Sequence, residues 1–460
     1  MDILSFSPSI DSNIISPDLV DFFSTVKASN GVGKIYKVLY YGQSIIEQNW
    51  SVKVSDYLRL RFGAEVFEFA NSAIGAHLAE RLVKTAESDV YPSQPDLIIL
   101  HVNGSHFSYE KLVSNIVKFT SAELIIANDH VTHPGELREF TNPWLIRVTN
   151  LLCRAIFFAF RERRMLNWRS WINNIFIRRM AYKYNLSMID VRYNWKQYVL
   201  QQRLAPVDLT VDGAHLNDIG NALMERIFVA SFDSVFAKIG SEGTPKYLEV
   251  SAEGFVPNDD GSFDFKFTGT KIELVLGNVP TERVKLLIDS VPPTQMPGGI
   301  QYSRSTHFPG TNWPVLLRVG SAKGLRVQGN LSFRLFNFST DRKEFEFTLT
   351  INDGDQISYG NSREGFLVGD IVVAPDDWNV SHAVDVLNIT LPDEFIVSVA
   401  GYSVGVDELN AESYTSGQRS LNGRIVLLAQ QLPLARHLLH IDCLEAAKLH
   451  SVRIYSPQAR

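Results

Sequence analysis

The protein has 460 residues, of which 45% are hydrophobic and 20% are charged, the composition of a globular chain with sizeable cores and not of a disordered one. At about 150 residues per folding unit, this length predicts roughly three units. The formal net charge of −6 provides no electrostatic basis for nucleic-acid binding, so no nucleic-acid partner is expected.

The two cysteines, Cys153 and Cys443, lie far apart and have no CxxC or Cys/His neighbours, so two buried thiols are favoured over a disulfide or a metal cage. The N-terminal stretch MDILSFSPSI lacks the basic start and apolar core of a signal peptide. The longest apolar run, 148–160, contains Arg154 and is shorter than the roughly 20 residues that a membrane span needs. No transmembrane segment is expected. The compartment stays open: secreted or periplasmic if a signal peptide has been trimmed, otherwise cytoplasmic.

Strand-like and helical patterns alternate up to about residue 240. In chain order, the sequence predicts a strand at 37–42, a helix at 51–62, a strand at 65–71, a helix at 76–87, a strand at 96–104, a helix at 108–120, and strands at 123–129 and 186–192. Short apolar strands separated by helices are typical of parallel βαβ units in a sheet that is covered on both faces. We therefore expect an N-terminal extension over 1–34 and an α/β domain over 35–240.

The remaining chain has almost no helical periodicity and alternates apolar with polar residues, which predicts antiparallel β-sandwiches. Two sandwiches fit about 215 residues better than one. We expect one sandwich to be formed by 245–293 together with 406–460, and an inserted or second sandwich to occupy 300–405. No loop resembles an EF-hand, so no calcium is expected.

Polar side chains collect where the predicted strands of the first half end, at Ser44, at Asn71, within 103–106, and at Asp129 and His130. Ligands of open α/β sheets bind beyond the carboxyl ends of the strands. This coincidence indicates a functional site at that edge of the sheet.

Asp212 and His215 lie one helical turn apart, just before a helix that is expected to begin near Asn217 or Asp218. A histidine that takes a proton from a serine needs a carboxylate to orient it and to stabilise its charged form, and Asp-x-x-His supplies both groups locally. Taken alone, the pattern is more often a turn with a capping aspartate.

Four short motifs, read in order, resemble the conserved blocks of the SGNH/GDSL hydrolase superfamily. They are GQSI at 42–45, NSAIG at 71–75, NGSH at 103–106 and DGAH at 212–215. Their order and spacing agree with the superfamily across 35–235, roughly half of the chain. The resemblance implies a flavodoxin-like, three-layer α/β domain with a parallel sheet, followed by one or two antiparallel, jelly-roll-like sandwiches.

The same resemblance implies the roles of individual residues. Ser44 would be the nucleophile, His215 the general base and Asp212 the partner that orients the base. The backbone N–H groups of Ser44 and Gly75 would bind the oxyanion. No cofactor is implied.

The sequence departs from the superfamily pattern at two positions. The third block usually reads Gly-x-Asn-Asp, and its Asn side chain is an oxyanion donor. Here His106 stands at the Asn position, and Asn103 is the alternative donor. Gln43 stands where Asp is more common and is expected to line the substrate pocket.

Asp129 and His130 are expected either to line the substrate pocket or to hold His106 in position, and a simple hydrogen-bonded pair between strand and loop is an equally good interpretation. A metal cluster that includes His101, His106 and His133 is the alternative. None of these residues reproduces a known metal-ligand spacing, so no metal site is predicted.

Residues 154–179 carry seven arginines against one acidic residue, Glu162, and include Trp168 and Trp171. This composition fits either a surface that binds an anionic sugar or a partner, or a solvated amphipathic helix packed beside the sheet, and the helix is favoured. His77 is expected to be a surface residue of a helix.

The sandwich strands resemble the carbohydrate-binding-like jelly-roll modules of glycan-active enzymes. Trp313, Trp378 and Tyr402 are candidates for stacking on sugar rings, but a role as core anchors is favoured. The sequence thus predicts a serine esterase that removes acyl groups, foremost acetyl, from a glycan or an acylated small molecule. The alternatives are an acyltransferase or a lipid or thioester hydrolase on the same site, or a non-catalytic glycan-binding protein on a decayed scaffold. The oligomeric state is not predicted.

Overall fold

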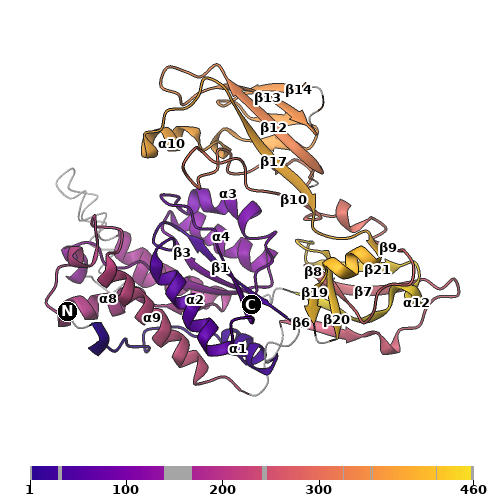
Figure 1. The fold of residues 1–460 in the computed structure, drawn as a ribbon, viewed down its shortest axis with the longest axis horizontal. Helices are drawn as coiled ribbons and strands as arrows, with labels where there is room; N and C mark the ends of the chain where they lie inside the picture. The colour runs from indigo at the N-terminus through magenta and orange to yellow at the C-terminus, as the bar shows by residue number, and fades with distance from the viewer. Residues whose placement is uncertain are drawn as a thin grey trace.

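The computed structural model describes residues 3–29, 34–138, 168–240, 246–324, 326–352, 354, 356–420 and 422–456. Figure 1 shows an α/β unit, with one β unit stacked above it and a second β unit beside it. Cys153 and the apolar run at 148–160 lie outside the described residues. Among the described helices, none has the length and hydropathy needed to cross a membrane.

The α/β unit is built on a five-stranded parallel sheet in the order β2-β1-β3-β4-β5. The strands are β1 (Tyr36–Gly42), β2 (Phe67–Asn71), β3 (Leu97–His101), β4 (Glu123–Ala127) and β5 (Ser187–Ile189). This 2-1-3-4-5 order is that of flavodoxin-like folds, so the expected fold class is confirmed. β3 and β4 are buried along their whole length, as the covered strands of a parallel sheet must be.

Helices cover both faces of this sheet. The helical segments are η1 (Ile3–Ser5), α1 (Pro17–Ser29), α2 (Asn49–Phe62), α3 (Ala79–Asp89), α4 (His106–Phe119), η2 (Pro134–Arg138), η3 (Ile172–Phe176), α7 (Ile177–Tyr184), α8 (Val191–Gln201), η4 (Pro206–Leu209) and α9 (Asp218–Phe236). Side chains alternate along a strand, so Tyr41 packs in the core beneath α3 and α4 while Tyr40 packs in the core beneath α2 and α9. The result is three layers with two apolar cores.

The N-terminal segment is part of the α/β unit. The Phe23 side chain on α1 is fully buried and contacts the rings of Phe62, Phe232 and Phe236. The residues before α1 also reach the edge strand β5 through an antiparallel bridge. The described part of 1–34 is therefore packed into the core of the α/β unit and is not a separate extension.

The sandwich beside the α/β unit joins segments from both sides of a long insertion, and we call it the C-terminal sandwich. Its strands are β6 (Tyr247–Ser251), β7 (Phe263–Gly269), β8 (Lys271–Leu276), β9 (Val284–Ile288), β18 (Glu408–Leu409), β19 (Gln418–Ser420), β20 (Gly423–Ala429), β21 (Ala435–Ile441) and β22 (Leu449–Tyr455). They form two antiparallel sheets, β18-β9-β21-β7 and β19-β20-β8-β22-β6, around one core. The short helical segments η5 (Ala252–Gly254), α11 (Ala411–Ser416) and α12 (Leu444–Ala447) lie between the strands.

The insertion between β9 and β18 forms the upper unit of Figure 1, which we call the inserted β unit. The unit is preceded by η6 (Pro293–Gln295), which contacts β9 and β20 of the C-terminal sandwich. Its own elements are β10 (Ile300–Tyr302), β11 (Gly320–Ser321), β12 (Gly329–Phe336), β13 (Glu346–Ile351), β14 (Gln356–Asn361), β15 (Phe366–Val368), β16 (Ile371–Val373), η7 (Pro375–Asp377), α10 (Val380–Leu387) and β17 (Phe395–Ser403). Trp313 and Trp378 are buried in its core, as favoured from the sequence, whereas Tyr402 is 40% exposed.

Candidate active site

Ser44 lies in the turn that leaves β1 at the carboxyl edge of the parallel sheet. The turn starts at Gly42, whose φ of +152° is a conformation that residues with a Cβ rarely adopt. A Cβ at this position would lie 2.0 Å from the carbonyl oxygen of His101, the last residue of the neighbouring strand β3. Glycine therefore lets β1 turn sharply against β3 and present Ser44 at the edge.

The structure brings Ser44, His215 and Asp212 together. The Ser44 Oγ lies 2.9 Å from His215 Nε2, and His215 Nδ1 lies 2.6 Å from Asp212 Oδ2. An ionised carboxylate only accepts hydrogen bonds, so His215 donates from Nδ1 and its Nε2 is left to accept the Ser44 hydroxyl proton. This is the arrangement in which a histidine can act as a general base toward a serine.

Asp212 also closes the loop that carries His215. Its Oδ1 accepts the backbone N–H groups of Ala214 and His215 at 2.9 and 2.7 Å. The hydrogen bond from the His215 ring, with those from the two backbone N–H groups, holds the pKa of Asp212 well below its ordinary value. The carboxylate is ionised at neutral pH although the site is open: the Asp212 and His215 side chains are 51% and 42% exposed.

Gln48 joins the Ser44 turn to the His215 loop, a role that the sequence did not reveal. Its Oε1 accepts the backbone N–H of Leu216 at 3.1 Å. Gln48 lies four residues after Ser44, and Leu216 directly follows His215. This contact thus joins the segments that carry Ser44 and His215 without involving either of their side chains. No sequence signal marks Gln48.

Gly75 lies beside Ser44, as the resemblance implies, but its N–H already has a partner. A Cβ built on Gly75 would lie 3.6 Å from the Ser44 Cβ. The Gly75 N–H donates to Glu47 Oε1 at 3.1 Å, and the same oxygen accepts the side-chain amide of Asn312 at 2.9 Å. Neither Glu47 nor Asn312 was singled out from the sequence.

The two candidate donors of the third block have other contacts. The Asn103 amide donates to Asp129 Oδ2 at 2.9 Å, and its backbone N–H donates to Gln43 Oε1 at 2.8 Å. Gln43 therefore ties the first block to the third. Within the described residues, the His106 ring contacts the rings of Phe107, Trp168, Trp171 and Phe176.

Asp129 and His130 form a buried polar pair at the end of β4. Asp129 Oδ1 lies 2.9 Å from His130 Nδ1 and 3.5 Å from His101 Nε2. Burial alone would raise the pKa of Asp129, but the imidazoles of His130 and His101 outweigh burial and lower it well below the ordinary value. His130 Nε2 lies 3.0 Å from the carbonyl oxygen of Ala214, so the pair supports the loop that carries His215.

Arg169 comes from the arginine-rich segment, of which residues 154–167 lie outside the described part. Arg169 lies 3.1 Å from Glu136 and 3.5 Å from Asp129 and is 31% exposed. Glu136 is fully buried and also pairs with the buried Arg192 at 3.1 Å. Arg169 thus faces buried carboxylates behind the site, and the expectation of a solvated face is wrong for this residue.

His77 corrects another expectation, because its side chain is fully buried and not on the surface of a helix. Its Nδ1 lies 2.9 Å from the Gly75 carbonyl oxygen, and its Nε2 lies 3.1 Å from the Asn379 amide of the inserted β unit. The Trp313 ring packs edge-on against it at 4.5 Å. Desolvation lowers the pKa of His77 to about 3, so the ring is neutral.

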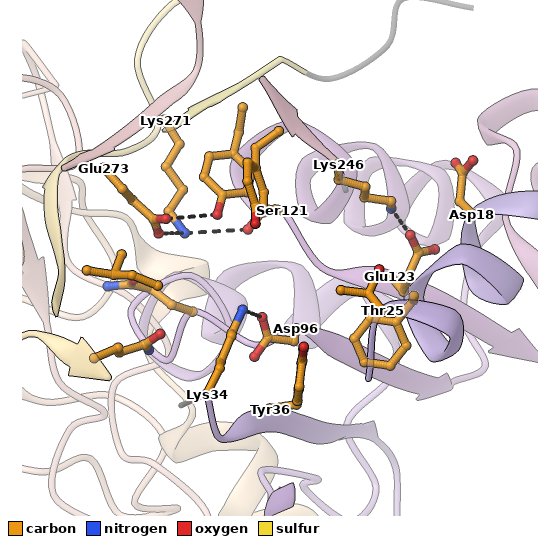
Figure 2. Close-up of a pocket in the computed structure, with 16 residues that line it drawn as sticks. Asp18, Thr25, Lys34, Tyr36, Asp96, Ser121, Glu123, Lys246, Lys271 and Glu273 are labelled. Carbon is orange, nitrogen blue, oxygen red and sulfur yellow. Dashed lines mark hydrogen bonds and ion pairs between the residues drawn. The ribbon is translucent and has the colours of Figure 1, made fainter. Parts of the chain in front are cut away.

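A solvent-open cavity of about 90 Å³ lies at the opposite edge of the sheet, between the α/β unit and the C-terminal sandwich (Figure 2). Tyr36 and Glu123, the first residues of β1 and β4, line it. Its lysines lie against carboxylates, in the pairs Lys34–Asp96 at 2.5 Å, Lys246–Glu123 at 2.5 Å and Lys271–Glu273 at 2.7 Å. This cavity is a polar junction between two units and is separate from the Ser44 site.

Within the described residues, no group of three or more His, Cys, Asp or Glu side chains is arranged to hold a metal ion. Cys443 is a partly buried free thiol. The Ser44 site thus offers a hydroxyl, an imidazole, a carboxylate and backbone N–H groups, which are the components of acyl transfer through a serine.

No family model and no curated protein matches the chain. Among solved structures, a two-domain esterase (CEX) active on acetylated mannans is 12% identical over 99% of this chain and 100% of its own, with a TM-score of 0.38. Axe2, an acetylxylan esterase from Geobacillus stearothermophilus, is 15% identical over 44% of this chain and 95% of its own, with a TM-score of 0.33. A GDSL-like lipase from Parabacteroides merdae is 16% identical over 43% of this chain and 96% of its own, with a TM-score of 0.31.

Proposed function

We propose that this protein is a serine esterase that removes acyl groups, foremost acetyl, from a carbohydrate. The observation that carries the proposal is the chain of contacts from Asp212 to His215 and from His215 to Ser44, at 2.6 and 2.9 Å, at the carboxyl edge of a parallel sheet. A turn with a capping aspartate would explain Asp212 alone, but it would not require the His215 ring to face a serine 171 residues away in the sequence.

The reaction proceeds in two acyl-transfer steps. His215 Nε2 takes the Ser44 proton as Oγ attacks the ester carbonyl, and Asp212 stabilises the resulting imidazolium. The tetrahedral intermediate collapses when His215 returns the proton to the departing sugar oxygen, which leaves an acyl group on Ser44. Water, deprotonated by His215, attacks this acyl-enzyme, and collapse of the second intermediate releases acetate and restores the Ser44 hydroxyl.

The exposure of the site supports an acyl group that is presented on a large molecule. About half of the Asp212 side chain and 42% of the His215 side chain are open to solvent, so the leaving alcohol does not have to enter a closed pocket. The inserted β unit reaches the same edge of the sheet through Asn312. A polymer bearing short acyl esters fits an open edge flanked by a second unit better than a small ligand that must be enclosed.

The test is acetate release from acetylated mannan and acetylated xylan by the wild type and by Ser44→Ala. We expect release by the wild type and a rate at least about 10³-fold lower in the variant, because the nucleophile is gone. Ser398→Ala is the matched control, since Ser398 is an exposed serine on β17. Equal release by the wild type and Ser44→Ala would contradict the serine mechanism. If the wild type released acetate from neither of the two glycans, the proposed substrate class would be contradicted.

A further inference from the structure

The Ser44 site needs oxyanion donors, and the side chains of the third block already have contacts of their own. One N–H of the Asn103 amide donates to Asp129, and the His106 ring lies among aromatic side chains. Serine esterases stabilise the tetrahedral oxygen with several preorganised N–H groups, each of which lies about 2.7–3.1 Å from it. The question is which side chain joins the backbone donors.

An oxygen atom already lies between two N–H donors beside Ser44. Glu47 Oε1 accepts the Gly75 N–H at 3.1 Å and the Asn312 amide at 2.9 Å. One of these donors is the backbone N–H that the resemblance assigns to the oxyanion. A negatively charged carboxylate oxygen thus occupies the kind of position in which an oxyanion is bound.

Arg304 of the inserted β unit also joins the Gly75 loop to the segment that carries Asn312. Its guanidinium donates to the Ser72 carbonyl oxygen at 3.0 Å and to the Asn312 carbonyl oxygen at 3.4 Å. Glu47 itself is exposed. Its carboxylate can therefore rotate into solvent, where it is hydrated and pays no desolvation cost.

The inserted β unit also fixes the backbone around Gly75. The Asn312 amide donates to the Ala73 carbonyl oxygen at 3.2 Å, and His382 Nε2 lies 3.3 Å from the Ala76 carbonyl oxygen. Ala76 has a φ of +55°, a costly value for a residue with a Cβ, which persists only where the surroundings impose it. Asn312 and the Gly75 loop therefore form one preorganised assembly.

We propose that the Asn312 amide, supplied by the inserted β unit, is the third oxyanion donor of the Ser44 site, and that the Glu47 carboxylate is an internal occupant that gives way to the acyl oxygen of the substrate. This inference rests on the proposed esterase function. It makes the inserted β unit a part of the catalytic apparatus. It also means that the free protein holds its own oxyanion donors in a blocked state.

The test measures two rates in the full-length protein: phosphonylation of Ser44 by a fluorophosphonate probe, and hydrolysis of p-nitrophenyl acetate. We expect Asn312→Ala to lower both kcat and the labelling rate by about 10- to 100-fold with KM unchanged, because one donor to the transition state is lost. Asn312→Asp is expected to be at least as slow, since a carboxylate cannot donate. Asn330→Ala, an exposed asparagine on β12 of the same unit, is the matched control. Wild-type rates in Asn312→Ala or Asn312→Asp would overturn the proposal.

Glu47→Ala tests the internal occupant. Labelling is expected to become several-fold faster than in the wild type, because the donors no longer have to exchange partners. Glu65→Ala, an exposed glutamate after α2, is the control. Slower labelling in Glu47→Ala would mean that Glu47 positions the Gly75 loop, and it would overturn its role as an occupant.

A double variant separates a direct role of Asn312 from one that acts through Glu47. If Asn312 only holds Glu47, its removal has no effect in a Glu47→Ala background. We expect the same 10- to 100-fold loss there. His382→Ala removes another contact of the Gly75 loop and is expected to cost less than Asn312→Ala. An equal cost would show that Asn312 acts only by holding the loop, and would overturn its role as a donor.

Failure of this inference is distinguishable from failure of the proposed function. Acetate release from glycans without any effect of the Asn312 variants would overturn the inference alone. Labelling of Ser44 without acetate release from glycans would contradict the proposed function, and the ratios of the labelling rates would still decide the role of Asn312. Absence of labelling in both the wild type and Glu47→Ala would overturn both.

Discussion

Asp212 serves two purposes in the loop that carries His215. One oxygen accepts two backbone N–H groups and closes the turn, while the other orients the imidazole. The alternatives considered from the sequence, a capping turn and a catalytic partner, are therefore not exclusive. The same carboxylate can do both because its two oxygens face different donors.

Replacing Asp212 by Asn separates the two purposes. The Asn oxygen can still accept the backbone N–H groups, so the thermal unfolding midpoint is expected to change little. The neutral amide cannot stabilise the imidazolium, and we expect kcat for p-nitrophenyl acetate to fall by about 10³-fold or more. Retention of more than a tenth of the wild-type kcat would argue against Asp212 as the partner of His215.

At the scale of elements, the loop between β2 and α3 shows why a local sequence is ambiguous. It carries Gly75 and His77, and its sequence is typical of an exposed turn that leads into a helix. In the structure, the inserted β unit covers the loop and buries His77 completely. Desolvation therefore opposes protonation of His77, with smaller contributions in the same direction from His382 and nearby arginines.

This burial predicts that acid weakens the contact between the loop and the inserted β unit. His77 titrates near 6.5 in the unfolded chain and near 3 in the folded one, so between these values only the unfolded state takes up the proton. Stability is expected to fall as the pH drops below about 6.5, by about 2 kcal/mol at pH 5 from this group. Urea denaturation of the wild type and His77→Gln at pH 7 and pH 5 measures the difference. The same pH dependence in both proteins would exclude His77 as its source.

At the scale of the whole molecule, partly buried ion pairs join the inserted β unit to α3. Arg304 pairs with Asp89 at 2.8 Å, and the Asp89 side chain is only 3% exposed. Arg326 pairs with Glu87 at 2.6 Å on the same helix. α3 directly follows the Gly75 loop, so the contacts that dock the unit on α3 also bring Asn312 to this loop. Figure 1 shows the inserted β unit above α3.

Arg304→Ala is expected to lower the free energy of unfolding by about 3–5 kcal/mol, because it leaves Asp89 buried without its partner. Arg334→Ala is the matched control, since Arg334 and Glu394 form an exposed pair that is 59% and 47% accessible. Its loss should cost less than about 1 kcal/mol. Urea denaturation of the full-length variants measures both changes. Equal losses of unfolding free energy in the two variants would show that the buried Arg304–Asp89 pair stabilises the protein no more than the exposed Arg334–Glu394 pair.

Periodicity and motif order predicted the parallel α/β fold, the antiparallel character of the second half, and the three residues that meet at the carboxyl edge of the sheet. These features follow from short-range physics: apolar spacing selects strand or helix, and parallel strands bring their carboxyl ends to one edge. Ser44 and His215 were found because each lies in a short local pattern at such an end.

The side-chain contacts around Gly75 could not be predicted in this way. Glu47 and Asn312 are separated by 265 residues, and they meet only because the inserted β unit docks on α3 and the Gly75 loop. The burial of His77 depends on the same docking. Docking is decided by complementary surfaces and paired charges of two folded units, and no spacing along the chain encodes it. The sequence thus specifies the local motifs that carry Ser44, Asp212 and His215, whereas the packing of the folded units determines which side chains lie around the Gly75 loop beside them.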